Sequence, residues 1–167
     1  MIRIGLISDT HSYLDPKVEK YFKEVDEIWH IGDVGDIDII HQLTKIKPVR
    51  GVYGNIDGQD IRNIFPKHAK FTCEEVTVWL THIGGYPGRY AKQVRERINF
   101  APPQLFITGH SHILKVMYDK KLKLLHINPG AAGKSGFHKV KTLVRFTIDK
   151  KEIKDLEVIE LGPKVEM

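Results

Sequence analysis

Apolar and polar positions follow two different periods along the first 55 residues. The run IRIGLISD is apolar and ends at Asp9, and EIWHIGD is a second such run that ends at Asp33. Between them, residues 16–25 carry apolar side chains at the spacing of a helix. A second helix is expected to begin with Asp36 as its N-cap and to end near Lys45, before VRGVYGN forms a third strand. The pattern predicts a βαβαβ opening.

The rest of the chain is richer in strand-like runs. VTVWLTH, LFITGH, KLKLLHIN, TLVRFTID and LEVIEL have the apolar content of strands, and short polar turns join several of them, as in antiparallel pairs. One amphipathic helix is expected over residues 89–100. We therefore predict an α/β fold of a single domain, residues 1–167, in which two packed mixed β-sheets are flanked by helices.

Composition and charge narrow the class of protein. The 167 residues are 41% hydrophobic, which suits one domain with a substantial core, and the lone Cys73 excludes an internal disulfide framework. The formal net charge is +5, but the lysines fall in short groups with few aromatic residues between them. We interpret them as solvated surface and do not expect a nucleic-acid partner, although a modest attraction for an anionic substrate fits this charge.

Targeting and membrane-spanning segments indicate the cellular compartment of a protein. Residues 1–10 have the features of neither a signal peptide nor a transit sequence, and no run approaches the roughly 20 apolar residues of a membrane span. We expect a cytoplasmic protein that has no membrane partner.

Polar side chains occur where the predicted strands end. They follow five successive strands along the chain, in this order: Asp9 and His11; Asp33; Asn55; His82; His110 and His112. Because ligands gather at the carboxyl ends of strands in α/β sheets, we expect all seven to face one crevice. A nitrogen and oxygen donor set without thiolate suits Mn, Fe, Zn or Co, and seven donors suit two metals about 3.5–4 Å apart, bridged by one carboxylate.

In the stretch GHSH, which follows an apolar run, one residue separates His110 from His112. In an extended chain such residues point to the same side, which predicts that the two imidazoles approach one target. Glycines precede three of the candidate ligands, at Gly32, Gly54 and Gly109, and are expected to let the backbone turn sharply there.

Each candidate also has a structural interpretation. Asp9 and Asn55 are common turn residues. Four other histidines are interpreted as exposed or internally satisfied polar groups: His41, His68, His126 and His138. His30, two residues before Gly32, is expected to hydrogen-bond a ligand. Turn chemistry does not explain four histidines at the same strand ends, which favours the metal site.

Five short motifs, taken in order, resemble the signature blocks of calcineurin-like metallophosphoesterases. They are DTH (9–11), GDVGD (32–36), GNID (54–57), LTH (80–82) and GHSH (109–112). The short length and the later INPGAAG (127–133) are similar to the small single-domain phosphodiesterase branch of that superfamily. Each motif alone is ordinary turn chemistry, but five in order at strand ends form a specific pattern.

The resemblance implies a dinuclear centre with two divalent ions, Mn²⁺ first and Fe, Zn, Ni or Co as alternatives. It divides the seven residues into ligands of one metal, a bridge and ligands of the other: Asp9, His11 and His112; Asp33; Asn55, His82 and His110. A hydroxide held between the metals would attack phosphorus in line. Asn55 and His110 would also act in catalysis by orienting a phosphate oxygen.

One position departs from the pattern of many phosphomonoesterases in the superfamily, where a histidine after the signature asparagine protonates the leaving group. Here that residue is Ile56. Loss of a general acid slows expulsion of a poor leaving group by about 10²–10⁴-fold, which favours a small phosphodiester or an activated ester as substrate. Water on a metal, His30 or Asp57 is a candidate replacement.

The segment IGGYPGRY, residues 83–90, leaves two readings open. Tyr86, Arg89 and Tyr90 are suited to bind the non-reacting phosphate and a ring of the substrate, or they belong to a loop that caps the next helix.

A metal-dependent phosphodiesterase is the first hypothesis for function. The alternative is a protein-interaction scaffold, because the superfamily includes a retromer coat subunit whose degraded metal site serves binding. The presence of all seven ligands favours the enzyme. A nuclease would need a basic groove that the sequence does not show, and small relatives suggest a homodimer.

Overall fold

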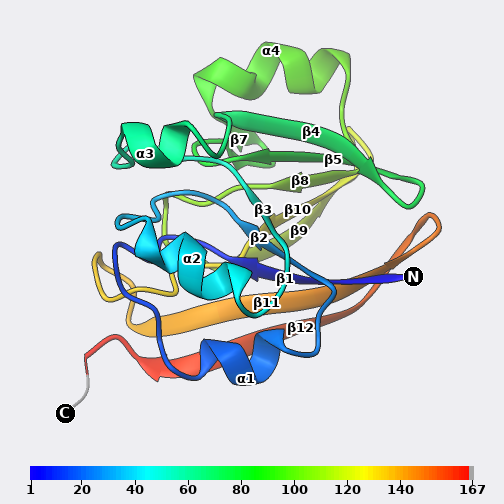
Figure 1. Ribbon diagram of the computed structural model, residues 1–167. Helices are drawn as coiled ribbons and strands as arrows, with labels where there is room; N and C mark the ends of the chain where they lie inside the picture. Colours follow the sequence, from blue (N-terminus) through cyan, green and yellow to red (C-terminus); the bar gives the residue numbers. More distant parts are fainter. Residues whose placement is uncertain (166–167) are drawn as a thin grey trace.

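The fold consists of two five-stranded mixed β-sheets packed face to face, with helices on the outer faces (Figure 1). The computed structural model describes residues 1–165. This arrangement confirms the predicted sandwich of two sheets flanked by helices. Among the described residues, no helix has the length and apolar character needed to cross a bilayer.

The first sheet contains the predicted βαβαβ opening. Its strand order is β12-β11-β1-β2-β3, with bounds Glu152–Pro163, Val140–Asp149, Ile2–Ile7, Glu27–His30 and Val49–Gly51. The pairs β1–β2 and β2–β3 are parallel, whereas β11 pairs antiparallel with both β1 and β12. Helices α1 (Val18–Phe22) and α2 (Asp38–Thr44) connect the parallel strands. Helix α3 (Gln59–Arg62) follows β3 and was not predicted.

The second sheet has the order β4-β5-β8-β10-β9, with bounds His68–Cys73, Val76–Thr81, Leu105–Ile107, Leu124–Asn128 and Lys115–Asp119. The pairs β5–β8 and β8–β10 are parallel, and the two edge strands pair antiparallel. The edge strands β4 and β9 were not predicted. Only the last residue of β4 is buried and none of β9 is, so neither strand has the apolar run that marked the central strands.

Three apolar clusters join the layers. The first lies between the sheets and includes Trp29, Leu80 and Phe146, all buried. The second packs α1, α2 and α3 on the first sheet, and the third packs α4 (Lys92–Phe100) on the second. The predicted helix over residues 89–100 is shorter than expected, because Arg89–Tyr90 forms β7, paired with β6 (Gly85–Tyr86).

Backbone hydrogen bonds connect the loops that follow the parallel strands. The N–H of Asp9 donates to the carbonyl of Gly32 (3.0 Å), which joins the ends of β1 and β2. The N–H of Gly109 donates to the carbonyl of His82 (3.0 Å), which joins the ends of β8 and β5. Across the two sheets, the N–H of His110 donates to the carboxylate of Asp9 (3.2 Å). The carboxyl ends of the parallel strands of both sheets therefore meet at one edge of the sandwich.

A buried ion pair lies beneath the first sheet. The ammonium of Lys141, on β11, is 2.6 Å from the Asp15 carboxylate, and both side chains are almost fully buried. Burial raises the pKa of Asp15, but the Lys141 ammonium outweighs it and holds that pKa below its usual range. Asp15 is therefore charged at neutral pH and balances the buried cation.

We predict that Asp15→Asn lowers the free energy of unfolding at pH 7 by about 3 kcal/mol, because it leaves the Lys141 ammonium buried without its counter-charge. The pKa of Asp15 is lower in the folded than in the unfolded state. The stability difference between wild type and variant is therefore full above the unfolded value of about 3.9 and shrinks as pH falls below it. Urea unfolding at several pH values measures this.

The matched control is Asp149→Asn, which removes one partner of the partly exposed ion pair between Lys154 and Asp149 (3.2 Å). Solvent screens that pair, so this variant should change stability little. Equal losses in the two variants, or a loss for Asp15→Asn that does not depend on pH, would contradict the assignment.

Candidate metal centre

The structure brings the seven predicted ligands together at the edge where the strands end. They lie directly at, or within five residues after, the carboxyl ends of β1, β2, β3, β5 and β8: Asp9 and His11; Asp33; Asn55; His82; His110 and His112. About a hundred residues of sequence separate the first from the last. The residues that the sequence placed at the strand ends therefore lie near one another in the fold.

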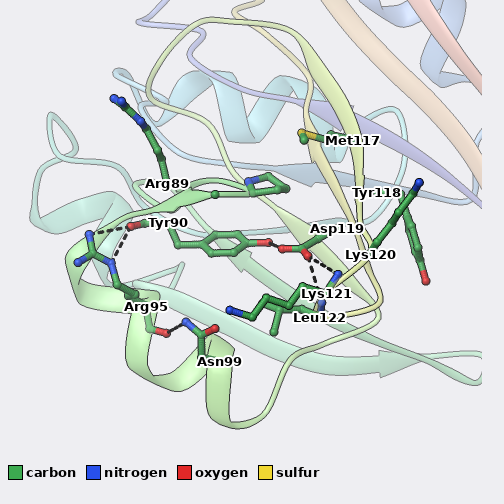
Figure 2. A pocket seen from close by; sticks show the side chains of 12 residues that line it. Arg89, Tyr90, Arg95, Asn99, Met117, Tyr118, Asp119, Lys120, Lys121 and Leu122 are labelled. Carbon is green, nitrogen blue, oxygen red and sulfur yellow. Dashed lines mark hydrogen bonds between the residues drawn. The ribbon is translucent and has the colours of Figure 1, made fainter.

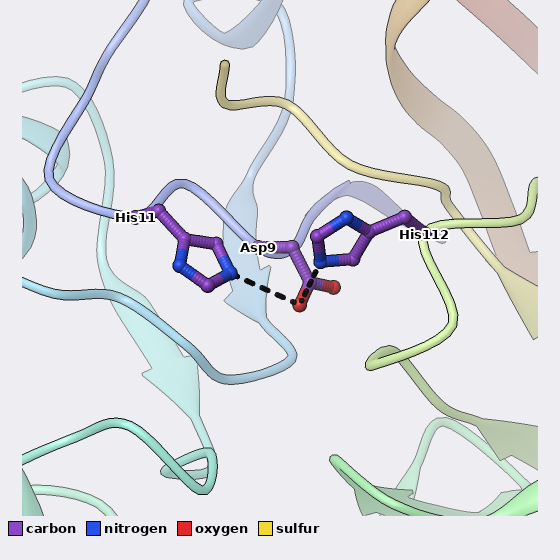
Figure 3. A group of neighbouring side chains, drawn as sticks. All are labelled: Asp9, His11 and His112. Atoms are coloured by element: carbon purple, nitrogen blue, oxygen red, sulfur yellow. Dashed lines mark ion pairs between the residues drawn. The ribbon is translucent and has the colours of Figure 1, made fainter. Parts of the chain in front are cut away.

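The first group consists of Asp9, His11 and His112, whose potential ligand atoms all lie within 4.8 Å of one another. Nε2 of His112 is 3.1 Å from Oδ1 of Asp9, and Nε2 of His11 is 3.8 Å from the same oxygen. Figure 3 shows the two imidazoles approaching the Asp9 carboxylate from its two sides. One carboxylate and two imidazoles thus converge on one point.

The second group consists of Asp33, His82 and His110, again with potential ligand atoms within 4.8 Å. Nε2 of His82 is 3.2 Å from Oδ2 of Asp33. The Asn55 side chain joins this group, because its Oδ1 lies 3.1 Å from Nδ1 of His110. The predicted partition of the histidines between two groups agrees with this geometry.

A single carboxylate oxygen lies between the groups. Oδ2 of Asp33 is 3.2 Å from Nε2 of His82 in the second group and 3.4 Å from Nε2 of His11 in the first. The other oxygen, Oδ1, accepts a hydrogen bond from the backbone N–H of Ile56 (3.1 Å). Asp33 is therefore anchored through one oxygen and faces both groups with the other.

Three buried atoms of the cluster have no hydrogen-bond partner among residues 1–165: Oδ1 of Asp9, Nε2 of His11 and Nε2 of His82. Buried polar atoms in folded proteins are nearly always paired. Nδ1 of His82 is 2.7 Å from the carbonyl oxygen of Ile31, which can only accept, so Nδ1 carries a proton and Nε2 is the nitrogen that would bind a metal. Unpaired acceptors that converge in this way fit a bound cation.

The protonation states also suit cation binding. Burial raises the pKa of Asp9, but the neighbouring His11 and His112 outweigh it and hold that pKa well below its usual range. Burial likewise raises the pKa of Asp33, and His82 reverses the effect. Burial lowers the pKa of His110, which favours the neutral ring. Asp9 raises the pKa of His11, and Asp33 outweighs burial and raises the pKa of His82. Metal binding would displace a proton from these two rings, whereas the charged carboxylates and the neutral His110 ring already have the forms that ligate metals.

The backbone takes an uncommon conformation at five of the seven residues. Asp9, His11, Asp33, His110 and His112 have φ between 45° and 69°, the left-handed region. Non-glycine residues rarely adopt it, and aspartate and histidine tolerate it better than most. Such strain is typical of functional sites, where the surrounding structure enforces it.

This conformation corrects the expectation for GHSH. His110 and His112 do not continue an extended strand, since β8 ends at Ile107 and both residues have positive φ. They point into different groups, with His110 beside His82 and His112 beside Asp9. The alternation rule for extended chains did not apply, because the left-handed turns rotate each side chain separately.

The glycines are needed for two different reasons. Gly32 has a φ of 97°, so the expected sharp turn is present there. At Gly54, a Cβ atom would lie 2.1 Å from Oδ1 of Asp33, and at Gly109 it would lie 2.4 Å from Oγ of Ser8. These two glycines allow close approach of the ligand loops, which the sequence did not indicate.

Two buried polar residues hold the ligand loops and do not ligate. His30 accepts a hydrogen bond at Nδ1 from the N–H of Gly32 (3.1 Å), and its Nε2 is 3.0 Å from Oγ1 of Thr10. The sequence predicted that His30 would hydrogen-bond a ligand, but it bonds to residues next to ligands. Burial lowers the pKa of His30 to about 4.

Asp57 accepts from the N–H groups of Gly35 (2.9 Å) and Gly54 (2.7 Å) and so ties the second and third ligand loops together. Its side chain is buried. Both His30 and Asp57 are therefore occupied in structural hydrogen bonds, and neither is placed as an obvious proton donor. His138, which was interpreted as a surface or structural residue, packs its ring on His112, with centroids 5.2 Å apart.

Within the segment 83–90, Arg89 and Tyr90 line a cavity away from the ligand groups, whereas Ile83 directly follows His82. The hydroxyl of Tyr90 donates to Asp119 (2.5 Å), and Arg89 lines a cavity of about 890 Å³ beside this bridge (Figure 2). Among the described residues, none of the seven predicted ligands lines that cavity. The Tyr86 ring packs under the Lys115 ammonium, 4.1 Å from the ring centroid. Of the two readings for Arg89, a role in binding the non-reacting phosphate of a substrate at the ligand groups has no support in this geometry.

Known proteins of similar sequence are probable members of a class of enzymes that is consistent with a metal site. Two probable metallophosphoesterases are similar in sequence. The protein of Methanothermobacter thermautotrophicus is 32% identical over 135 residues, 77% of this chain and 76% of that protein. The protein of Methanocaldococcus jannaschii is 30% identical over 134 residues, 77% of this chain and 67% of that protein.

Solved structures share the fold. An archaeal phosphodiesterase has a TM-score of 0.75 at 22% identity, covering 95% of this chain and 100% of that one. Vps29 of Entamoeba histolytica in complex with Zn²⁺ has a TM-score of 0.73 at 15% identity, covering 96% and 100%. The model of the calcineurin-like phosphoesterase superfamily domain matches residues 2–151. The chain therefore belongs to the calcineurin-like phosphoesterase superfamily.

Proposed function

We propose that the protein is a metal-dependent phosphodiesterase that hydrolyses a small phosphodiester at a dinuclear centre. The observation that carries this proposal is the position of Asp33, whose Oδ2 lies within 3.4 Å of a histidine nitrogen from each ligand group. Two adjacent cation sites with a shared carboxylate are the arrangement used to activate phosphoryl groups for displacement. The superfamily membership of the chain and the archaeal phosphodiesterase of similar fold support it.

The seven residues would be divided between two cations. Asp9, His11 and His112 would hold one cation, and His82, His110 and Asn55 the other, with Asp33 between them. The cations would supply Lewis-acid activation of water and of the phosphoryl group. Nitrogen and oxygen donors without thiolate suit Mn, Fe, Zn or Co, and Mn²⁺ is proposed among them because of the resemblance to the superfamily.

Hydrogen bonds prepare these side chains for that task. The Ile31 carbonyl fixes the tautomer of His82, and the Ile56 N–H anchors Asp33. Asn55 and His110, whose Oδ1 and Nδ1 atoms are 3.1 Å apart, would orient a phosphate oxygen. Because these groups are positioned before substrate binds, little reorganisation is needed during the reaction.

The proposed preference for diesters rests on Ile56. Its side chain is 48% exposed and its N–H is bonded to Asp33, so the residue stands beside the second group without offering a proton. Since His30 and Asp57 are engaged in structural hydrogen bonds, neither replaces the missing acid. A poor leaving group would therefore depart slowly.

A protein-interaction scaffold is the alternative function. The likeness to Vps29 leaves it open, and a run of exposed apolar residues on and before the edge strand β9 would suit a partner: Ile113, Leu114, Val116, Met117 and Tyr118. The full ligand set favours the enzyme. The single-domain organisation, the cytoplasmic location and the homodimer expected from the sequence stay predictions.

The ligand assignment predicts the behaviour of two variants. Asp33→Asn and His112→Ala should lower Mn²⁺-dependent kcat/KM for bis(p-nitrophenyl) phosphate by more than the roughly 10–100-fold that loss of an outer hydrogen-bond partner costs. His41→Ala, which changes an exposed histidine on α2, is the matched control and should retain activity. Circular dichroism checks folding. Wild-type turnover in either ligand variant would refute the assignment.

The role of Ile56 predicts a change in substrate preference. Ile56→His should raise kcat/KM for alkyl phosphomonoesters relative to diesters by about tenfold or more, which is part of the roughly 10²–10⁴-fold that an optimally placed general acid contributes. Because the native side chain is half exposed, a larger polar ring is accommodated without loss of core packing. Ile56→Gln is the control without a titratable proton. An unchanged ratio in Ile56→His would show that this position does not determine the preference.

A further inference from the structure

A second cavity opens directly beside the second ligand group. It measures about 240 Å³ and its walls include Asn55 and His82, two of the predicted ligands. The remaining polar wall comes from Tyr53, Arg62, Lys67, Thr81 and Gln93. We refer to this cavity as the Arg62 pocket. A substrate that reacts at the ligand groups would place part of its non-reacting portion here.

The charge of the Arg62 pocket is positive. Arg62 and Lys67 line it, and within residues 1–165 no aspartate or glutamate does. Among the described residues, neither cation has a carboxylate within the 4.0 Å of an ion pair. Arginine and lysine side chains without a partner at a cavity wall favour an anion.

Arg62 is held in place and still has free donors. Its guanidinium lies over the Tyr53 ring, 4.5 Å from the centroid, and its Nε donates to the backbone carbonyl of Asp57 (2.7 Å). These contacts use one face and one donor, and leave the two Nη groups to bind a ligand. Because the Asp57 carboxylate also bonds to the N–H of Gly54, Arg62 is fixed to the loop that carries Asn55.

The size of the Arg62 pocket suits an anionic group of several atoms. A volume of 240 Å³ is about eight times the roughly 30 Å³ that a water molecule occupies in the liquid. A planar guanidinium binds a phosphate through two parallel hydrogen bonds, and a lysine beside it balances the second charge. The pocket therefore fits a phosphate monoester better than a neutral ring.

We propose that the Arg62 pocket binds a terminal phosphate on the non-reacting part of the substrate while the phosphodiester lies at the two ligand groups. This inference rests on the proposed function and narrows it to a phosphodiester that carries a further phosphate. It assigns to Arg62 and Lys67 the role that the sequence had suggested for Arg89, which lines a different cavity.

The kinetic test compares two p-nitrophenyl phosphodiesters whose second arm ends in a hydroxyl in one and in a phosphate in the other. Wild type should prefer the phosphate-bearing diester. Arg62→Gln should lower the ratio of the two kcat/KM values by about tenfold or more, because a charge-assisted bidentate contact is lost. Arg62→Lys should restore part of the ratio. If Arg62 only supports the Asn55 loop, both substrates fall equally, and the unchanged ratio would overturn the proposal.

The matched control is Arg3→Gln, which removes the same charge from an exposed residue of β1 at the opposite end of that strand from Asp9. Its ratio should equal that of wild type. An equal decrease in Arg3→Gln would mean that net charge, and not the Arg62 pocket, attracts the phosphate, and would also overturn the proposal.

A binding measurement on metal-free protein separates this inference from the proposed function. Inorganic phosphate should shift the backbone amide resonances of Ile83 and Gln93, which line the Arg62 pocket, in a saturable manner. Arg62→Gln should weaken this binding about tenfold, and added salt should weaken it in both proteins. This result can hold even if no diester is hydrolysed. Absence of saturable shifts, or equal binding by Arg62→Gln, would contradict the proposal.

Discussion

Two buried carboxylates determine the character of this structure. Asp9 is fully buried and Asp33 is 3% exposed, and both stay charged because imidazoles surround them. Burial of a charge is costly unless it is paired or coordinates a metal. In return, the carboxylates raise the pKa of His11 and of His82, and Oδ1 of Asp9 has no hydrogen-bond partner among residues 1–165. Two cations would supply the missing balance, which makes them part of the stability of this edge as well as of its chemistry.

Rigid connections between the strand ends and loops hold these buried charges in place. Parallel strands from both sheets end at one edge, and loops in the left-handed conformation turn the ligands toward each other. Asp57, His30 and the close packing of Gly54 against Asp33 fix those loops from behind. The same loops position Arg62, so that a substrate pocket and the ligand cluster share one support. Rigid support of this kind is what preorganised catalysis requires.

The sequence was sufficient for the features that depend on local pattern. Apolar runs predicted the central strands, and the polar residues after them predicted the cluster, because strand ends in such sheets meet. Edge strands β4 and β9 lacked an apolar run and were missed. The separation of His110 from His112 and the close approach at Gly54 depend on tertiary geometry, which periodicity does not contain. Arg62 lies outside all five motifs, and only the folded chain shows its place beside Asn55.

Anomalous diffraction at the manganese absorption edge, from crystals grown with Mn²⁺, tests the central claim most directly. The account predicts two peaks, one among Asp9, His11 and His112 and one among Asn55, His82 and His110, with the Asp33 carboxylate between them. A single peak, or none at these side chains, would contradict it.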